Sequence, residues 1–445
     1  MQNQLVLKQN RIPILLALTS ALFYVSFAYP LVRTDTFKLL TLYVALFFLF
    51  YKLVQLLKHN LQFLTWLAFG FRALFILAIP NLSQDFYRFI WDGRMILEGL
   101  NPYLHTPESF ISNGVFPVEQ TQELYNGMGT LNGSHFTNYP PLNQLCFAIA
   151  GVFAGKSILG SVVVMRLLII AADFGTLVYG KKLLEKLKLP AYHIFWYLLN
   201  PFIIIELTGN LHFEGVMIFF LVWSLYLLHV GKWQWSSLVF AMSVLVKLIP
   251  LLLIPIYFQK IKGIKSAIFM SIVCLSIIIS FVPFSSLEFI INFTETTALW
   301  FTNFEFNASV FYLARAVGYW FVDFNIISYY GILILLIIPF FILFIIKKRH
   351  DKISTQDLIV TMLFALSLYY FTATTVHPWY VATLLILSIF TRYKFVLVWS
   401  FVVMLSYTAY SQDNYTENLW LVALEYLLVY SVFIYEVLLK KTIRL

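Results

Sequence analysis

Residues 81–103 read NLSQDFYRFIWDGRMILEGLNPY and follow three long apolar segments. The stretch contains two Asp, two Arg, one Glu and five aromatic residues. Tyr and Trp gather where a membrane meets water, and charged side chains avoid the hydrocarbon interior. The stretch therefore predicts that the chain leaves a membrane near residue 81 and begins a polar loop at its surface.

The composition of the whole chain agrees with a membrane environment. Of 445 residues, 61% are hydrophobic and 11% are charged, and the mean hydropathy is +0.82. A soluble chain carries about 25% charged residues. Cys146 and Cys274 both lie in apolar runs, so neither a disulfide framework nor a zinc cluster is expected. We expect an all-α polytopic membrane protein.

Twelve apolar stretches approach the length of about 20 residues that a membrane-spanning helix needs. They are residues 12–32, 37–57, 61–80, 160–180, 191–208, 214–230, 266–283, 326–346, 355–373, 378–391, 395–410 and 419–438. The first is too long for a signal-peptide core and is expected to be retained.

The positions of the charges predict the orientation. With the N-terminus inside, most of the 30 Lys and Arg residues fall on inner segments, and most acidic residues fall outside. This is the asymmetry expected of cytoplasmic loops. Both termini are therefore expected in the cytoplasm, and residues 81–159 on the outer side. The net charge of +9 then reflects orientation and not nucleic-acid binding.

One apolar segment does not fit a simple crossing. Lys232 and Lys260 flank residues 233–259, and both are expected inside. The middle of the segment reads VKLIP (246–250), with a Lys and a Pro. We therefore predict a re-entrant hairpin of two short helices with Lys247 near its turn, because irregular backbone at membrane depth must be buried in protein or line a cavity.

The outer loop 81–159 is the longest polar segment. Loops of this length are uncommon unless they are functional. DFYRFIWDGRMILEGL (85–100) has its apolar and aromatic residues at helical spacing, which predicts amphipathic helices on the membrane surface. No separate soluble domain or repeat is visible, so residues 1–445 are expected to form a single transmembrane domain.

Four charged residues lie close together at the start of this loop. Asp85 comes a few residues after the third predicted span, and Asp92 falls on roughly the same helical face. Arg88 and Arg94 lie nearby. An ordinary interfacial helix with its charges facing water would have the same residues. Other segments predicted on the outer side also carry polar side chains, and this favours a binding site shared between segments over an ordinary interfacial helix.

Two of these segments begin predicted spans. TGNLHFEGV (208–216) contains His212 and Glu214, and TTVHPWYV (374–381) contains His377. Both segments have a structural alternative. An acidic side chain such as Glu214 stabilises a helix N-terminus, and a His beside Trp and Tyr, such as His377, is common at a membrane interface.

Two more residues complete the set of candidates. TNYPP (137–141) places Tyr139 in a rigid loop before the next apolar run. Lys247 near mid-membrane costs about 2.5–3.5 kcal/mol on insertion scales, so an anion is expected beside it. The structural alternative for Tyr139 is a stiff loop with no role in catalysis. For Lys247 it is a side chain that reaches the membrane surface or pairs with Glu206 or Glu214.

An outer carboxylate with several cationic or hydrogen-bonding groups suits transfer from a lipid phosphate to a hydroxyl group. The carboxylate takes a proton from the acceptor, and the cations hold the leaving phosphate. The sequence has no Gly-rich nucleotide loop, as expected if the transferred sugar arrives on a lipid.

The outer-loop motif resembles that of the GT-C superfamily of membrane glycosyltransferases, in particular bacterial polyprenyl-phosphate-mannose-dependent mannosyltransferases. The matching residues are Asp85, Tyr87, Phe89, Trp91, Asp92, Gly93, Arg94, Gly99, Asn101, Pro102 and Tyr103. Further blocks follow in the family's order: YPPL (139–142), GNLHFEG (209–215), VKLIPLLLIP (246–255), FEFNASVFYLAR (304–315) and HPWY (377–380).

The resemblance implies an inverting transfer of a hexose, with mannose the family's common choice, from a polyprenyl-phosphate sugar to a glycan or glycolipid. It implies that Asp85 is the base. No cofactor and no metal-binding residue are expected. The residues expected to bind donor phosphate or substrate are Arg88, Asp92, Arg94, Tyr139, His212, Glu214, Lys247 and His377. The expected location is a bacterial inner membrane, with the site facing the periplasm.

Three other functions are compatible with parts of the sequence. A secondary transporter uses broken helices and charges within the membrane, but most charges here lie at the outer face. A flippase or a polysaccharide ligase would also handle polyprenyl carriers. A metal enzyme could use Asp85, His212, Glu214 and His377, although no helix-spaced HExxH-type motif is present.

Overall fold

The computed structural model describes residues 11–347, 353–411 and 415–441. The regular structure in these residues is helical, and the single β-type pairing among them joins Phe306 to Thr375. The predicted all-α class is therefore confirmed for the described chain. The chain ends fall outside the described residues.

Five helices are long and apolar enough to cross a membrane by themselves, which indicates a membrane protein. Among the described residues they are α2 (Arg11–Ala28), α3 (Thr36–Leu57), α9 (Ile158–Lys186), α15 (Ile264–Phe281) with the short turn after it, and α22 (Leu419–Phe433) with its last turn. The other predicted spans also contain helix, although none of these helices, over its described residues, passes the same test of length and apolar character by itself. These are α4 (Leu61–Ala73), α10 (Phe195–Leu198), α11 (Pro201–Ile203), α12 (Glu214–His229), α18 (Ile327–Lys347), α19 (Thr355–Thr372), α20 (Val381–Ser388) and α21 (Phe395–Val402).

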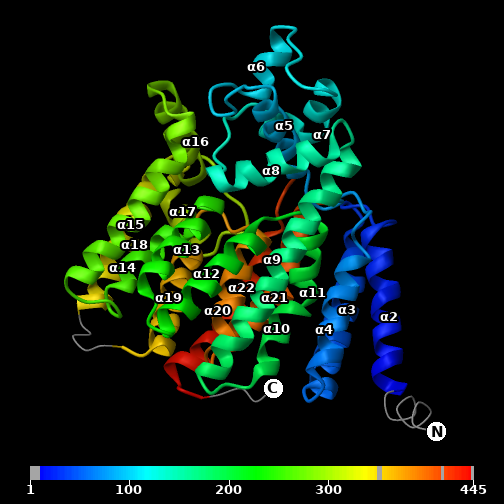
Figure 1. The fold of residues 1–445 in the computed structure, drawn as a ribbon, viewed down its shortest axis with the longest axis vertical. Helices are drawn as coiled ribbons and strands as arrows, with labels where there is room; N and C mark the ends of the chain where they lie inside the picture. Colours follow the sequence, from blue (N-terminus) through cyan, green and yellow to red (C-terminus); the bar gives the residue numbers. More distant parts are fainter. Residues whose placement is uncertain (1–10, 348–352, 412–414, 442–445) are drawn as a thin grey trace.

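A helical cap covers one end of this bundle. It contains α5 (Asp85–Leu97), α6 (Pro107–Ser112), α7 (Thr121–Gly133) and α8 (Pro141–Ala154), drawn in cyan tones at the top of Figure 1. Helix α16 (Leu287–Thr302) rises beside the cap, with α17 (Val310–Gly318) below it. Helix α2 begins, and the last helical turns end, at the opposite end of the bundle (Figure 1).

The packing of α5 differs from the expectation of a helix lying on a surface. Arg88, Asp92 and Arg94 are buried, as are the apolar residues between them, because α7 and α8 pack against α5. Gly93 allows this approach: a Cβ there would lie 2.3 Å from the carbonyl oxygen of Phe147 on α8. The charges of α5 therefore bind other parts of the cap and do not face water.

A sharp bend separates the helical segment 201–209 from α12. The two segments meet at 115°, and the first ends in a π-helical turn, Ile204–Gly209. Arg166 of α9 donates hydrogen bonds to the carbonyl oxygens of Thr208 (2.8 Å) and Gly209 (2.9 Å), which have no partner in their own helix. The bend places residues 210–213 beneath the cap.

The segment 233–259 folds back on itself. Helix α13 (Trp233–Val246) ends at Lys247, whose backbone is extended (φ −147°, ψ 141°), and Ile249–Leu253 and α14 (Ile254–Tyr257) follow. His229, just before α13, contacts Thr355, and Lys260, just after α14, donates to the carbonyl oxygen of Ile353. Both ends of the segment therefore lie beside residues 353–355.

Candidate active site

Asp85 is the first residue of α5, where the cap begins. Its Oδ1 atom accepts a hydrogen bond from Nδ2 of Asn132 (3.1 Å), and its backbone N–H donates to Oγ of Ser83. Burial raises the pKa of the Asp85 carboxyl, whereas the hydrogen bond from Asn132 and the positive charges of Lys247 and Arg33 lower it. A carboxylate with a raised pKa, held by one hydrogen bond, is suited to accept a proton.

Lys247 reaches this region from the turn of the folded-back segment. Its Nζ lies 3.2 Å from Oε1 of Glu214 at the start of α12, and 4.8 Å from the ring centroid of Tyr139. Glu214 is nearly buried, and Lys247 keeps about a fifth of its side chain exposed. This ion pair is the structural alternative given for Lys247, its pairing with Glu214. Tyr139 packs edge-on against Phe89 of α5, which links the ammonium group to the cap.

Two histidines enclose a tryptophan on the far side of the cluster. The Trp379 ring stacks on His212, with centroids 3.7 Å apart, and on His377, with centroids 4.5 Å apart. Burial and the charge of Lys247 lower the pKa of both histidines, to about 3 for His377, so both rings are neutral near pH 7. Nε2 of His212 and Nδ1 of His377 are buried without hydrogen-bond partners.

Contacts with residues 304–306 hold the segment that carries His377 in this region. Residues 304–306 run beside 374–376: the Phe306 N–H donates to Thr374, and the Val376 N–H donates back to the Phe306 oxygen at 2.8 Å. The Phe306 ring also stacks on His377. The predicted blocks 304–315 and 377–380 are therefore in contact.

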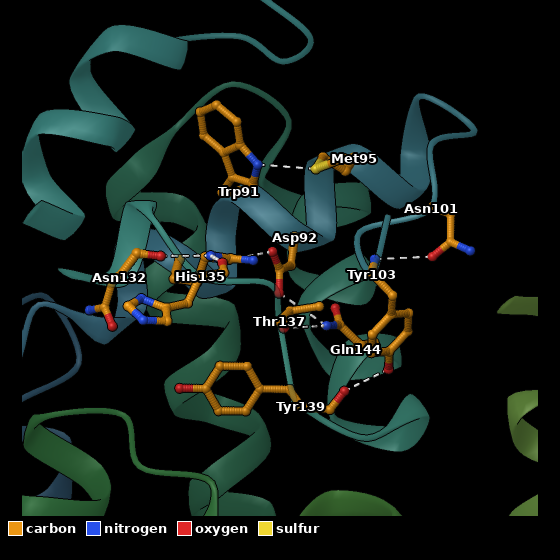
Figure 2. A network of polar contacts seen from close by, with 11 residues as sticks. Trp91, Asp92, Met95, Asn101, Tyr103, Asn132, His135, Thr137, Tyr139 and Gln144 are labelled. Carbon is orange, nitrogen blue, oxygen red and sulfur yellow. Dashed lines mark hydrogen bonds and ion pairs between the residues drawn. The ribbon is translucent and has the colours of Figure 1, made fainter. Parts of the chain in front are cut away.

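Arg88, Asp92 and Arg94 lie further along α5, buried within the cap. Arg88 Nε pairs with Oδ1 of Asp92 at 2.8 Å, and Oδ2 of Asp92 accepts from Gln144 at 3.0 Å (Figure 2). Arg94 donates to the carbonyl oxygens of Glu119 and Lys156. These polar groups therefore hold the cap together.

Arg33 is a component of the cluster that the sequence analysis did not identify. It lies between α2 and α3, its guanidinium carbon is 4.3 Å from the ring centroid of Tyr410, and it donates to the carbonyl oxygen of Leu82. No acidic side chain lies within ion-pair distance of it among the described residues. An Arg in a predicted outer segment departs from the usual charge asymmetry, and this signal could have identified it.

The structure thus divides the predicted residues into two groups. Around the Lys247 charge it gathers Asp85, Tyr139, Glu214, His212 and His377. The second group, Arg88, Asp92 and Arg94, supports the cap. Within the described residues, no group of three or more His, Cys, Asp or Glu residues is arranged to hold a metal ion.

Comparison with known protein families matches residues 13–261 to the family described as "Alpha-(1->6)-mannopyranosyltransferase, N-terminal domain". The matched region contains the whole cap, the bend before α12 and the folded-back segment with Lys247. No curated protein and no solved structure matches the chain.

Proposed function

Because the chain belongs to the alpha-(1->6)-mannopyranosyltransferase family and is a glycosyltransferase, we propose that it moves a mannosyl group from a polyprenyl phosphate to a hydroxyl group. The acceptor is a glycan or a glycolipid at the outer face of the membrane. The observation that carries this proposal is the half-buried Asp85 carboxylate, within the field of two cations and at the start of the cap.

The proposed reaction is a single displacement. Asp85 removes the proton of the acceptor hydroxyl while its oxygen forms a bond to the anomeric carbon. The bond between that carbon and the phosphate oxygen breaks, and the polyprenyl phosphate leaves with the electron pair. The attack comes from the side opposite the leaving group, so the configuration at the anomeric carbon inverts.

Two cations stabilise the leaving phosphate in this proposal. Charge that develops in a transition state is best met by cations already fixed in place. Lys247 is partly neutralised by Glu214, whereas Arg33 is without an acidic partner among the described side chains. We assign the neutral rings of His212 and His377 to hydrogen bonds with the sugar or the phosphate, since each has a buried nitrogen that makes no hydrogen bond, although Nε2 of His212 lies 3.7 Å from Oε2 of Glu206.

Replacement of Lys247 by Met should lower donor affinity by about 1.5–3 kcal/mol, the value of a hydrogen bond to a charged group. The binding of a polyprenyl-phosphate sugar to purified protein measures this. Glu214→Gln is the matched variant, because it removes the other half of the same ion pair. Equal loss of thermal stability in both variants, with donor affinity unchanged, would show that the pair is only structural.

The proposed topology has twelve spans and a re-entrant hairpin at 233–259, with both termini in the cytoplasm and the site facing the periplasm. The support is the pair of contacts that hold both ends of this segment beside residues 353–355. In a variant without Cys146 and Cys274, single cysteines at positions 232 and 260 should react only from the cytoplasmic side. A cysteine at Gln122 in the cap should react from outside, and outside labelling at position 260 would contradict the hairpin.

A transfer assay tests the function itself. Purified protein in detergent or nanodiscs receives a polyprenyl-phosphate mannose and a mannose-containing acceptor, and the product is identified by mass spectrometry. The same assay with polyprenyl-phosphate glucose tests the sugar, and GDP-mannose tests a nucleotide donor. Movement of lipid-linked glycan across vesicles without transfer would support a flippase instead.

A further inference from the structure

We propose that Asn132 is a positioning residue that orients the Asp85 carboxylate, and that Arg88 and Asp92 act through Asn132. This inference rests on the proposed role of Asp85 as the base. It gives the second half of the outer-loop motif a function that is distinct from substrate binding.

The contact between Asn132 and Asp85 is direct and uses one carboxylate oxygen. Nδ2 of Asn132 donates to Oδ1 of Asp85 at 3.1 Å. The Ser83 hydroxyl, which accepts from the Asp85 N–H, is the other hydrogen-bonding side chain that lowers the pKa of this carboxyl. The amide thus restrains Oδ1 and leaves Oδ2 for the acceptor hydroxyl. A neutral donor also orients the base without the strong loss of basicity that an ion pair would cause.

Asn132 lies at the end of α7, where little regular structure holds it. Gly129 interrupts the helix with a positive φ of 76°, and α7 ends at Gly133. The position of Asn132 therefore depends on contacts from outside α7.

Arg88 supplies these contacts from α5. Its Nη1 donates to the backbone oxygens of Asn132 (2.7 Å) and His135 (2.8 Å), while its Nε pairs with Asp92. Asp92 is fully buried and also accepts from Gln144 of α8. Figure 2 shows Asp92 facing Gln144, with Asn132 and His135 on the other side of the network. Asp92, Arg88 and Asn132 thus form a continuous series of contacts that ends at Asp85.

The test is the pH dependence of kcat/KM in Asn132→Ala. Loss of a hydrogen bond to the charged form raises the pKa of a carboxyl, so the acid limb of the profile should move upward by about one pH unit. Below this limb the ionised fraction, and with it kcat/KM, falls about tenfold for one unit. Gln122→Ala is the matched control, because Gln122 is an exposed amide on α7 that bonds only to Asn126.

Asn132→Asp tests the same contact without a change of shape. Two carboxyl groups about 3 Å apart cannot both ionise easily, so this variant should move the acid limb further upward than Asn132→Ala does. Arg88→Lys keeps the positive charge beside Asp92 but loses the hydrogen bonds to the carbonyl oxygens of Asn132 and His135. It should reproduce the Asn132→Ala shift, and the double variant should show no additional shift.

The outcomes of these experiments distinguish a failure of this inference from a failure of the proposed function. An acid limb that stays at the wild-type pH in both Asn132 variants, while Asp85→Asn is inactive, would overturn the positioning role and leave Asp85 as the base. Full activity of Asp85→Asn would remove the base itself. Shifts in Asn132→Ala and Asn132→Asp, with none in Gln122→Ala, support the inference.

Discussion

Replacement of Asp85, the proposed base, by Asn should lower turnover about 10²–10⁴-fold, the contribution of a positioned general base. The Asn side chain has almost the same shape and can still meet Asn132, so the fold and donor binding should persist. The measurement is kcat with saturating donor and acceptor, with donor affinity determined separately. Glu108→Gln is the control, because Glu108 is an exposed carboxylate in the same loop.

The proposed role of Asp85 also predicts how the rate changes with pH. The base acts in its ionised form, so the rate falls as the pH falls through the pKa of Asp85. Burial raises that pKa, and the acid limb should therefore lie above the ordinary range of an aspartate. The limb should disappear in the residual activity of Asp85→Asn. A folded Asn variant with near-normal turnover would move the role of base to Asp92 or Glu214.

Replacement of Asp173 by Leu should destabilise the protein by about 3–5 kcal/mol, because it leaves a buried charge without its partner. Arg72 Nε pairs with Oδ2 of Asp173 at 2.7 Å, and both side chains are fully buried. Arg72 also donates to the carbonyl oxygens of Ala68 and Leu198, so the pair joins α4, α9 and the segment before α11. The midpoint of denaturant unfolding in detergent measures the effect.

Two further variants test whether the unpaired charge causes this loss of stability. The double variant Arg72→Met with Asp173→Leu removes both charges and should recover most of the lost stability, since apolar replacement of a buried pair is often neutral. Glu185→Gln on the same helix α9 breaks an exposed pair with Lys181 and should change stability by less than about 1 kcal/mol. Equal destabilisation in the single and double variants would show that side-chain packing matters more than the charge.

The sequence predicted the helical class and the residues around Lys247, because both depend on signals that lie close together along the chain. Apolar length indicates helices, and a charge within an apolar run requires a partner. Arg72 and Arg166 also lie within predicted spans, and the same reasoning could have identified them. Their partners, Asp173 and the carbonyl oxygens of residues 208 and 209, come from other helices.

The orientation of α5 could not be predicted in the same way. Helical spacing shows that Asp85, Arg88 and Asp92 lie near one another, but it does not show which side of the helix another element covers. The packing of α7 and α8 decides that Arg88 and Asp92 are buried. No feature of the sequence pointed to Asn132, because a single Asn is common in a polar loop.

The pairing of residues 304–306 with 374–376 has a consequence for the order of events during synthesis. Asp85, Asn132 and Tyr139 leave the ribosome early, whereas Trp379 and His377 follow after more than half of the chain has been made. Contacts between such distant segments form late, because a long loop must close first. Until then, the His212 ring lacks the tryptophan that stacks on it. The nascent chain therefore contains Asp85, the proposed base, long before the segment with His377 and Trp379 joins the candidate site.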